Sequence, residues 1–440
     1  MQDDTTARPA EQSAPAGAVG VQALGWVAFC IVVSGGLTYA YLALVARSLP
    51  VPDYGWFGSY WSLALVIGFG AFLPVELELA RLLQARPAAA RLPAGALRAL
   101  GGLGLVNVAL VLAAGPVLVS SLGGETGFLL ALLCVCVVSA GQFLLRGLLL
   151  GSGRLGLHGT VLLVDSGLRV VLATALSWAY PDASGADYAW TLVAAMALAH
   201  LPLLAWLLLR RRRAAAGPVA AERERPGAFL GAVGHLLIGT LSAQVLLNAA
   251  PVLIAALAAP GEAVLAAQFV ASYTLVRLPL FVAVPLQSAM IPVLTRLQNE
   301  GDGSRLRGFL ARGLVVTGAL AVLALGVGLW LGPWVVTLVF GRDYALSGSA
   351  IAVLAVGSVL HLGLLVASQA LVAAARHRRV AVVWVSGLAV ACLVVVLTPG
   401  LVLRASLAFT LGSGVALAVA AVTLLVSRRS APVDTASAHA

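Results

Sequence analysis

Charged residues inside long apolar stretches are the features of this sequence best suited to chemistry. Arg277 stands near the middle of the apolar stretch 264–292, shortly before Pro279. An arginine at the centre of a membrane helix costs about 2.5–3.5 kcal/mol on insertion scales, so it usually faces a polar cavity or a fixed partner. Its guanidinium offers paired donors to phosphate oxygens, and Pro279 would bend the helix and free backbone carbonyls. We interpret Arg277 as a cavity residue; the alternative is a structural ion pair with a carboxylate elsewhere.

Three further charged residues lie inside the apolar stretches. Asp165 and Arg169 are spaced i, i+4 with the acid first, the favourable order for an intrahelical ion pair. They form either a self-neutralised pair or part of an interior cavity. Arg146 stands about one turn from the end of its stretch, where it either snorkels to the lipid headgroups or lines a cytoplasmic vestibule.

A second group of charges lies where the stretch 57–82 ends. Glu78 and Arg81 have i, i+3 spacing and are predicted to pair. Glu76 points to another face of the helix and is left over, so it is either a gate or structural residue or a proton-coupling site. His361, in the middle of its own stretch, is either a hydrogen-bonding group or a proton relay.

Uncharged polar residues give weaker signals. Asn248 and Gln369 are either interhelical hydrogen-bonding groups or saccharide contacts, and the same alternatives hold for Gln142, Gln244 and Gln268. Sequence signatures of catalysis are missing. There is no Walker A motif, and Gly151–Gly156 fits G-x-G-x-x-G by letter but follows no strand. We predict a protein that is not an enzyme, takes no cofactor and holds no metal. Among enzymes, the alternative that the sequence still allows is a membrane glycan polymerase or ligase with its active site in the loop 332–345.

The composition places these residues in a membrane protein. Of the 440 residues, 61% are hydrophobic and 10% are charged, and the mean hydropathy is +1.02. Long apolar runs without alternation predict membrane helices, because each backbone amide must be satisfied within its own segment. Twelve such stretches are predicted: 20–47, 57–82, 96–121, 127–150, 158–180, 189–210, 229–258, 264–292, 309–331, 346–375, 380–398 and 401–427.

The arginines orient these helices. All 27 basic residues are arginine, and most lie in alternate gaps between the stretches. The runs Arg210–Arg213 and Arg376–Arg379 are examples, whereas the opposite gaps hold Asp53, Glu125 and Asp182 among others. Basic residues of short loops stay cytoplasmic, so both termini are predicted to be cytoplasmic. The net charge of +10 is therefore an orientation signal rather than a nucleic-acid footprint.

The chain is predicted to consist of two parallel lobes. A charged linker, 211–228, separates an N-lobe, 20–210, from a C-lobe, 229–427, and the tails 1–19 and 428–440 are predicted to be disordered. Weak sequence similarities between the two halves, with an offset of roughly half the chain length, support a parallel repeat of the kind found in transporters. Two lobes with a substrate site between them would expose that site to each side in turn.

Three short motifs stand out along the chain: Ala46–Gly55, Phe340–Ala345, and Ser368–Leu371 with the following Arg376–Arg378 loop. In their order and spacing they resemble motifs of the polysaccharide transport family, the Wzx-type lipid-linked oligosaccharide flippases of the MOP (MATE-like) superfamily. The resemblance implies an all-α fold of twelve helices. It also implies that the protein moves a polyprenyl-diphosphate-linked glycan to the outer leaflet of a bacterial cell membrane. It also implies lipid partners and a place beside glycan-assembly enzymes. A MATE-like cation-coupled exporter of small molecules is the alternative, and a membrane scaffold for glycan assembly is a third possibility.

Overall fold

The computed structural model describes residues 21–85, 92–214, 226–259, 261–280, 303–373 and 377–426, and it is built from helices throughout these ranges. The first half contains α1 (Val21–Ser48), α2 (Val51–Leu65), the π-helix η1 (Val66–Phe72), α3 (Leu73–Ala85), α4 (Ala94–Ala113), α5 (Gly115–Ser121), α6 (Thr126–Gly151), α7 (Leu155–Ala179) and α8 (Gly185–Ala214). The second half contains α9 (Pro226–Leu257), α10 (Ala263–Val276), α12 (Gly303–Trp330), α13 (Gly332–Phe340), the 3-10 helix η2 (Arg342–Tyr344), α14 (Gly348–Ala373), α15 (His377–Leu397) and α16 (Leu401–Val426).

The predicted all-helical membrane fold is confirmed. Within the described ranges, eleven helices are long and apolar enough to cross a membrane, and α10 is a shorter apolar helix. The predicted stretch 57–82 forms one continuous span made of α2, η1 and α3, whereas 96–121 is divided into α4 and α5 at Ala114, just before Gly115 and Pro116. Residues 281–292, the last part of the predicted stretch 264–292, lie outside the described residues. The same is true of the predicted tails 1–19 and 428–440.

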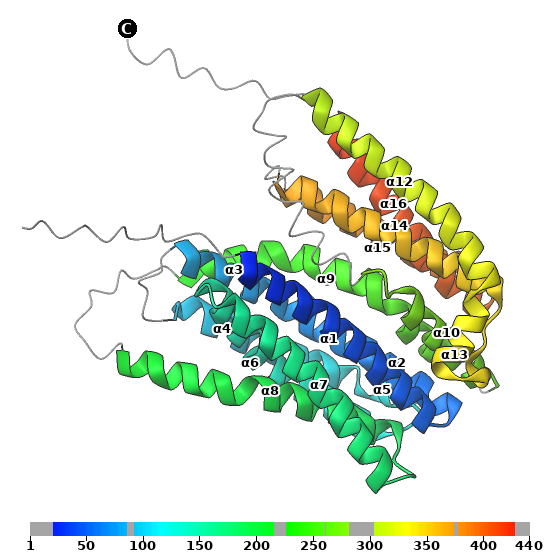
Figure 1. Ribbon diagram of the computed structural model, residues 1–440, viewed down its shortest axis with the longest axis horizontal. Helices are drawn as coiled ribbons and strands as arrows, with labels where there is room; N and C mark the ends of the chain where they lie inside the picture. Colours follow the sequence, from blue (N-terminus) through cyan, green and yellow to red (C-terminus); the bar gives the residue numbers. More distant parts are fainter. Residues whose placement is uncertain are drawn as a thin grey trace, which may run out of the picture.

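The helices form two groups (Figure 1). In the first group α1 packs along α7, and α6 packs against α3 and α8. In the second group α14 packs against α12 and α16, and α15 packs against α16. Helix α9 contacts both groups, because it touches α2, η1 and α3 on one side and α15 and α16 on the other. Helices α8 and α9 also extend into the predicted linker 211–228, to Ala214 and from Pro226.

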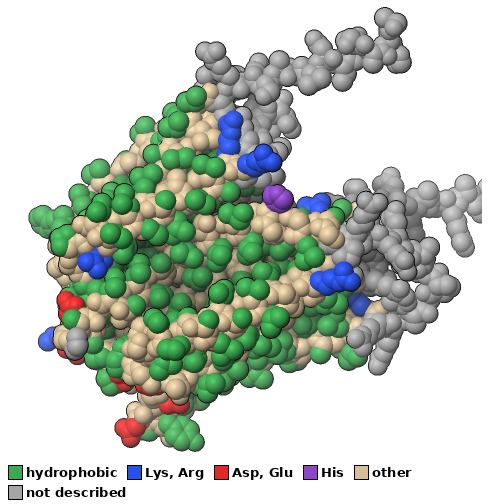
Figure 2. Space-filling view, turned by 180° about the vertical axis from the view of Figure 1, so that it is seen from behind, with side chains coloured by type: hydrophobic (Ala, Val, Ile, Leu, Met, Phe, Trp, Pro, Cys, Tyr) green, Lys and Arg blue, Asp and Glu red, His purple; other side chains and the backbone are tan. Residues whose placement is uncertain are grey.

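The surface shows a charge asymmetry along the helices. Figure 2 shows a broad band of hydrophobic side chains, with most of the visible arginines toward one end and the acidic side chains gathered at the other. Several tryptophans and leucines of the membrane-length helices are exposed, among them Trp178, Trp330, Leu105 and Leu110. An apolar band of this kind matches a hydrocarbon core, and the arginine end corresponds to the side that the positive-inside rule assigns to the cytoplasm.

The two groups are joined firmly at the end where α2 meets α10, which we call the α2–α10 seam. Arg47, at the end of α1, donates from Nη2 to the carbonyl of Leu338 (2.6 Å) and from Nε to that of Val339 (3.0 Å) in α13. The hydroxyl of Tyr344 donates to the carbonyl of Ala46 over 2.8 Å. Two side chains, one from each group, thus bind backbone of the other group.

Aromatic and glycine contacts complete the seam. The buried ring of Tyr54 lies 5.3 Å from the ring of Tyr344, centroid to centroid, in an edge-on arrangement. A Cβ atom on Gly55 would lie 3.1 Å from the Cα of Ala267 in α10. From this seam, Figure 1 shows α12, α14, α15 and α16 diverging from α1–α8 toward the opposite end of the molecule.

The first prediction concerns Gly55. Gly55→Ala should lower the free energy of unfolding by about 1–3 kcal/mol, the usual effect of overpacking, because the new methyl group would press on the backbone of Ala267. Thermal unfolding of the purified protein in detergent measures the loss. The control is Gly102→Ala in α4, where a Cβ meets nothing within 4 Å and alanine is the better helix former. Equal midpoints for the two variants would contradict the close approach of α2 and α10.

Candidate functional site

The backbone around Arg277 leaves the α-helical path. Arg277 follows the last residue of α10, Val276, and the amide of Leu278 bonds to the carbonyl of Leu275 (3.0 Å) in a tight turn. Pro279 comes next and has no amide hydrogen to donate. The α-helical path therefore ends directly before the arginine, next to the proline at which a bend is predicted.

The freed carbonyls are taken by tyrosines. Thr274 carbonyl oxygen, which no longer receives the amide of Leu278, accepts the hydroxyl of Tyr39 in α1 over 2.9 Å. In α9, Pro251 likewise leaves the carbonyl of Leu247 without its amide donor, and the hydroxyl of Tyr273 donates to it over 2.7 Å. Both carbonyls therefore keep a hydrogen-bond donor, as a nonpolar surrounding requires.

Arg277 is held by an amide and a ring rather than by a carboxylate. Its Nη2 donates to Oδ1 of Asn248 over 3.0 Å, and its guanidinium carbon lies 5.3 Å from the ring centroid of Tyr273. Asn248 is oriented in turn by Gln244, whose side-chain oxygen accepts from Nδ2 over 3.0 Å. No carboxylate of the described residues pairs with Arg277, which is only partly buried. Among the described residues, Asn248 is the hydrogen-bond acceptor recorded for this guanidinium, which carries five N–H donors.

This arginine lies where the two helix groups meet. Tyr39 of α1 belongs to the first group and His361 of α14 to the second, and both lie within electrostatic reach of Arg277. Asn248 is on α9, which contacts both groups. The structure therefore brings together Arg277 and Asn248, two of the predicted site residues, at a central position.

Arg146 and Glu76 form a buried ion pair, which corrects two predictions. Nε of Arg146 lies 3.0 Å from Oε2 of Glu76, and Nη2 donates to Oε1 over 3.2 Å. Arg146 is 9% exposed and Glu76 is 2% exposed. The prediction that Arg146 snorkels or lines a vestibule is wrong, and so is the prediction that Glu76 is left without a partner.

The close packing of α3 and α6 explains this pair. A Cβ on Gly147 would lie 3.1 Å from the carbonyl oxygen of Glu76, so the missing side chain lets the two helices approach. The guanidinium of Arg146 also lies over the rings of Phe69 and Phe143, at 5.3 and 4.9 Å from their centroids. Desolvation of both ions is then offset by the charge pair and by ring contacts.

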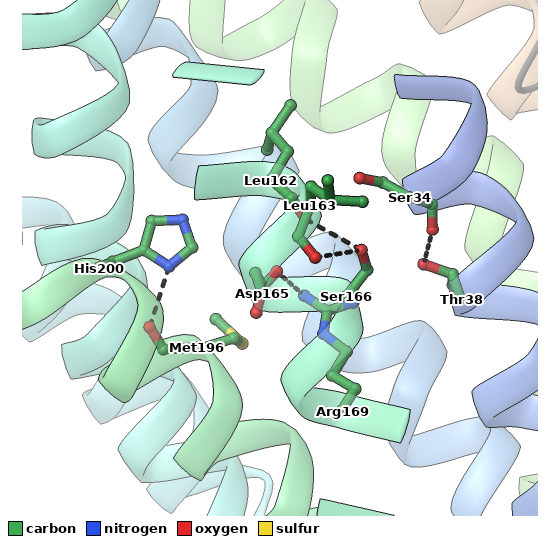
Figure 3. A network of polar contacts seen from close by, with 9 residues as sticks. All are labelled: Ser34, Thr38, Leu162, Leu163, Asp165, Ser166, Arg169, Met196 and His200. Atoms are coloured by element: carbon green, nitrogen blue, oxygen red, sulfur yellow. Dashed lines mark hydrogen bonds and ion pairs between the residues drawn. The ribbon is translucent and has the colours of Figure 1, made fainter. Parts of the chain in front are cut away.

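Asp165 and Arg169 form the intrahelical pair that their spacing predicts (Figure 3). Both side chains are buried to a similar degree, and the guanidinium lies 5.4 Å from the ring centroid of Trp61. The second carboxylate oxygen of Asp165 is buried without a hydrogen bond from the described protein. His200 on α8 lies nearby, and its Nδ1 lies 2.9 Å from the carbonyl of Met196.

The remaining predicted site residues lie apart. Glu78 and Arg81 pair as predicted, with Nη2 of Arg81 2.6 Å from Oε1 of Glu78. His361 is buried on α14, where Nδ1 lies 3.0 Å from the hydroxyl of Ser413 on α16. This contact matches the hydrogen-bonding interpretation of His361. Gln369 lies later on α14 and is half-buried.

Two buried histidines were missed by the sequence analysis. His158 on α7 and His200 on α8 are 6% and 0% exposed, and each has one ring nitrogen without a hydrogen-bond partner among the described residues. Both belong to the first helix group, near the Asp165 and Arg146 pairs. A search for histidines in all apolar stretches, rather than for His361 alone, could have found them.

Solved structures with this arrangement of helices are membrane transporters. The chain superposes on a multidrug resistance MATE family transporter of the MOP superfamily in an inward-facing conformation with a TM-score of 0.56, 19% identity and coverage of 92% of this chain and 93% of the other. A Vibrio cholerae MATE transporter matches with a TM-score of 0.60, 13% identity and 92% and 95% coverage. A MOP superfamily transporter from Pyrococcus furiosus, described as having a binding pocket of reverse polarity, matches with a TM-score of 0.58 and 16% identity. The match covers 92% of this chain and 94% of the other. The chain therefore has the MATE transporter fold.

Sequence comparison then defines the family. No family model matches the chain. The uncharacterized protein Rv1510 of Mycobacterium tuberculosis is 30% identical over 422 residues, which cover 92% of each chain. The uncharacterized protein Rv3630 of the same species is 28% identical over 440 residues, with 96% of each chain covered. This chain belongs to the same family as the mycobacterial protein Rv1510.

The second prediction tests the buried pair on α3 and α6. Glu76→Gln alone or Arg146→Met alone should lower the free energy of unfolding by about 3–5 kcal/mol, because each leaves one buried charge unpaired. The double variant should be more stable than the sum of the two losses implies.

Chemical unfolding in mixed micelles measures this double-mutant cycle. The matched control is Arg312→Gln on α12, where the side chain is exposed and the change should stay within about 0.5 kcal/mol. Additive losses in the double variant would show that Glu76 and Arg146 do not interact.

Proposed function

We propose that this protein is a transporter that moves a polyprenyl-diphosphate-linked oligosaccharide, or a related lipid-linked glycan, from the inner to the outer leaflet of a bacterial cell membrane. The proposal depends most on one observation: Arg277 lies at the junction of the two helix groups with an amide partner and no described carboxylate partner. The MATE transporter fold supports transport, and cell-surface polysaccharide biosynthesis is the process such a flippase serves.

The chemistry of a diphosphate suits this site. A guanidinium binds two phosphate oxygens with parallel hydrogen bonds, and such charge-assisted bonds are strong where water is excluded. Asn248 and Gln244 provide amide groups beside Arg277 that can reach sugar hydroxyls. The polyprenyl tail would stay in the lipid while the saccharide passes between the two helix groups.

The α2–α10 seam supports an alternating-access cycle. The groups are closed where Arg47 and Tyr344 bind backbone across the seam, and they diverge toward the end that carries most arginines. With that end in the cytoplasm, both termini are cytoplasmic and the state is inward-facing. Transport requires the seam to open while the opposite end closes, with α9 contacting both groups throughout.

The acidic residues argue against a cation as the substrate. A cation exporter needs free carboxylates in its binding site. Among the described residues of the membrane interior, Glu76 pairs with Arg146, Glu78 with Arg81, and Asp165 with Arg169. A MATE-like exporter of small cations is the second candidate, supported by the fold, and it would have to break one of these pairs.

The ion pairs are our candidates for gating and coupling. Protonation of Glu76 would remove the charge that holds α3 to α6 through Arg146, and Glu78 with Arg81 lies on the next turns of α3. Asp165 and Arg169 offer a second buried pair, which lies within α7. His361 and Gln369 on α14 complete the set, as a link between helices and as a saccharide contact.

The third prediction tests Arg277. Arg277→Ala should reduce flipping of a fluorescent polyprenyl-diphosphate N-acetylglucosamine in proteoliposomes by about tenfold or more, since one charged hydrogen bond contributes about 1.5–3 kcal/mol. Arg277→Lys should retain part of the activity, because it keeps the charge but loses the planar fork. Dithionite quenching of the outer leaflet measures the rate.

Two controls separate this effect from misfolding and from the second candidate. Arg404→Ala removes an arginine that binds the Thr398 carbonyl outside the site, so flipping should remain near the wild-type rate. Efflux of ethidium from the same vesicles tests for cation export. Unchanged flipping in Arg277→Ala, or ethidium transport without any flipping by the wild type, would contradict the proposal.

A further inference from the structure

A second cluster of arginines surrounds a small cavity away from Arg277. The cavity has a volume of about 180 Å³ and lies where the end of α6, the following turn and the end of α8 come together. Its polar lining consists of Ser152, Arg154, Arg210 and Arg211, and its apolar lining is leucine. No carboxylate belongs to this lining, all of which is described. Three guanidinium groups without a counter-charge favour an anion.

The turn between α6 and α7 builds one wall of the cavity. This is the segment Gly151–Gly156 that matches a nucleotide-binding pattern by letter only. Gly153 has φ +69°, a left-handed conformation that glycine adopts readily, and the amide of Arg154 bonds to the carbonyl of Leu149 over 2.9 Å. A Cβ on Gly151 would lie 2.7 Å from Leu83, so α6 packs directly on α3. The turn holds Ser152 and Arg154 at the cavity.

Arg211 is the positioned arginine of the cluster. Its Nη2 donates to the hydroxyl of Ser152 over 3.1 Å, which fixes the guanidinium against the turn. Its Nη1 is buried and has no hydrogen-bond partner among the described residues. An orphaned buried donor beside a cavity is a group that an anionic ligand would satisfy.

The surroundings of the cavity select a lipid over a soluble anion. Arg210 lies over Trp206 at 4.5 Å from the ring centroid, and Trp206 is 45% exposed on the membrane-length helix α8. Leu209 beside it is 55% exposed. Tryptophan and arginine together are typical of the level of the lipid headgroups. Basic pockets between membrane helices at the cytoplasmic side bind acidic headgroups.

We propose that this cavity, which we call the Arg154–Arg211 site, binds the phosphate of an anionic lipid headgroup. The bound phosphate would accept hydrogen bonds from Nη1 of Arg211 and from Arg154. The acyl chains of the same lipid would lie along Trp206 and Leu209. Such a lipid would tie α6 and α7 to α8 within the first helix group. The proposal does not depend on the identity of the transported substrate.

Native mass spectrometry of the full chain tests the site, with lipids retained from nanodiscs of phosphatidylcholine that contain increasing phosphatidylglycerol. The double variant Arg154→Gln/Arg211→Gln should weaken phosphatidylglycerol binding about tenfold to thirtyfold, since each arginine near the surface contributes about 1 kcal/mol. The matched control is Arg98→Gln/Arg312→Gln, two exposed arginines that do not line the cavity. This control should bind nearly as well as the wild type.

Two further arms complete the test. Arg154→Lys/Arg211→Lys keeps both charges and should fold even if the glutamine variant does not, with an intermediate loss of affinity. Inorganic phosphate is added to nanodiscs of phosphatidylcholine alone to test a soluble anion. Stabilisation by phosphate without retention of phosphatidylglycerol would overturn the lipid proposal. Equal retention by the wild type and by both cavity variants would overturn the site.

Discussion

The cost of leaving a charge unpaired in a nonpolar surrounding is the constraint on which this structure depends. Three carboxylates of the described membrane interior are each matched with an arginine: Glu76, Glu78 and Asp165. Arginines that face the lipid headgroups have water or lipid as partners. Arg277 fits neither case, because it lies between the helix groups and is held by Asn248. A charge retained under this constraint is the reason why we propose that an anion binds at Arg277.

Proline has a similar effect on the backbone. Pro251 removes the amide donor of the Leu247 carbonyl, and Tyr273 satisfies that carbonyl. In the turn before Pro279 the amide of Leu278 bonds to Leu275 instead of Thr274, and Tyr39 satisfies the Thr274 carbonyl. A single hydrogen bond, from the hydroxyl of Tyr39 to the backbone of α10, joins α1 to α10. Such a contact is strong enough to fix one arrangement and weak enough to be exchanged when the groups move.

Local patterns predicted the helices and the pairs within one helix, but not the partners across helices. The apolar lengths predicted the spans, and the spacing of Asp165 with Arg169 and of Glu78 with Arg81 predicted their pairing. Glu76 and Arg146 are far apart in sequence, and they meet because Gly147 allows α3 and α6 to approach closely. That contact depends on packing between elements, and a single sequence does not encode its register in any local period.

Two of the three motifs that suggested a family have a structural role at the seam, independent of any substrate. Ala46, Arg47, Tyr54 and Gly55 come from one motif, and Phe340 and Tyr344 come from another, yet all six lie together at the α2–α10 seam. Arg47 binds backbone carbonyls at the end of α13 rather than a side chain. The contact therefore requires arginine at position 47 but no particular side chain in α13. In the alternating-access cycle proposed above, this end must close and reopen in every cycle, because the substrate site must never be open to both sides of the membrane at once. Residues that make such a reversible seal would be constrained by that cycle itself, whatever the substrate is.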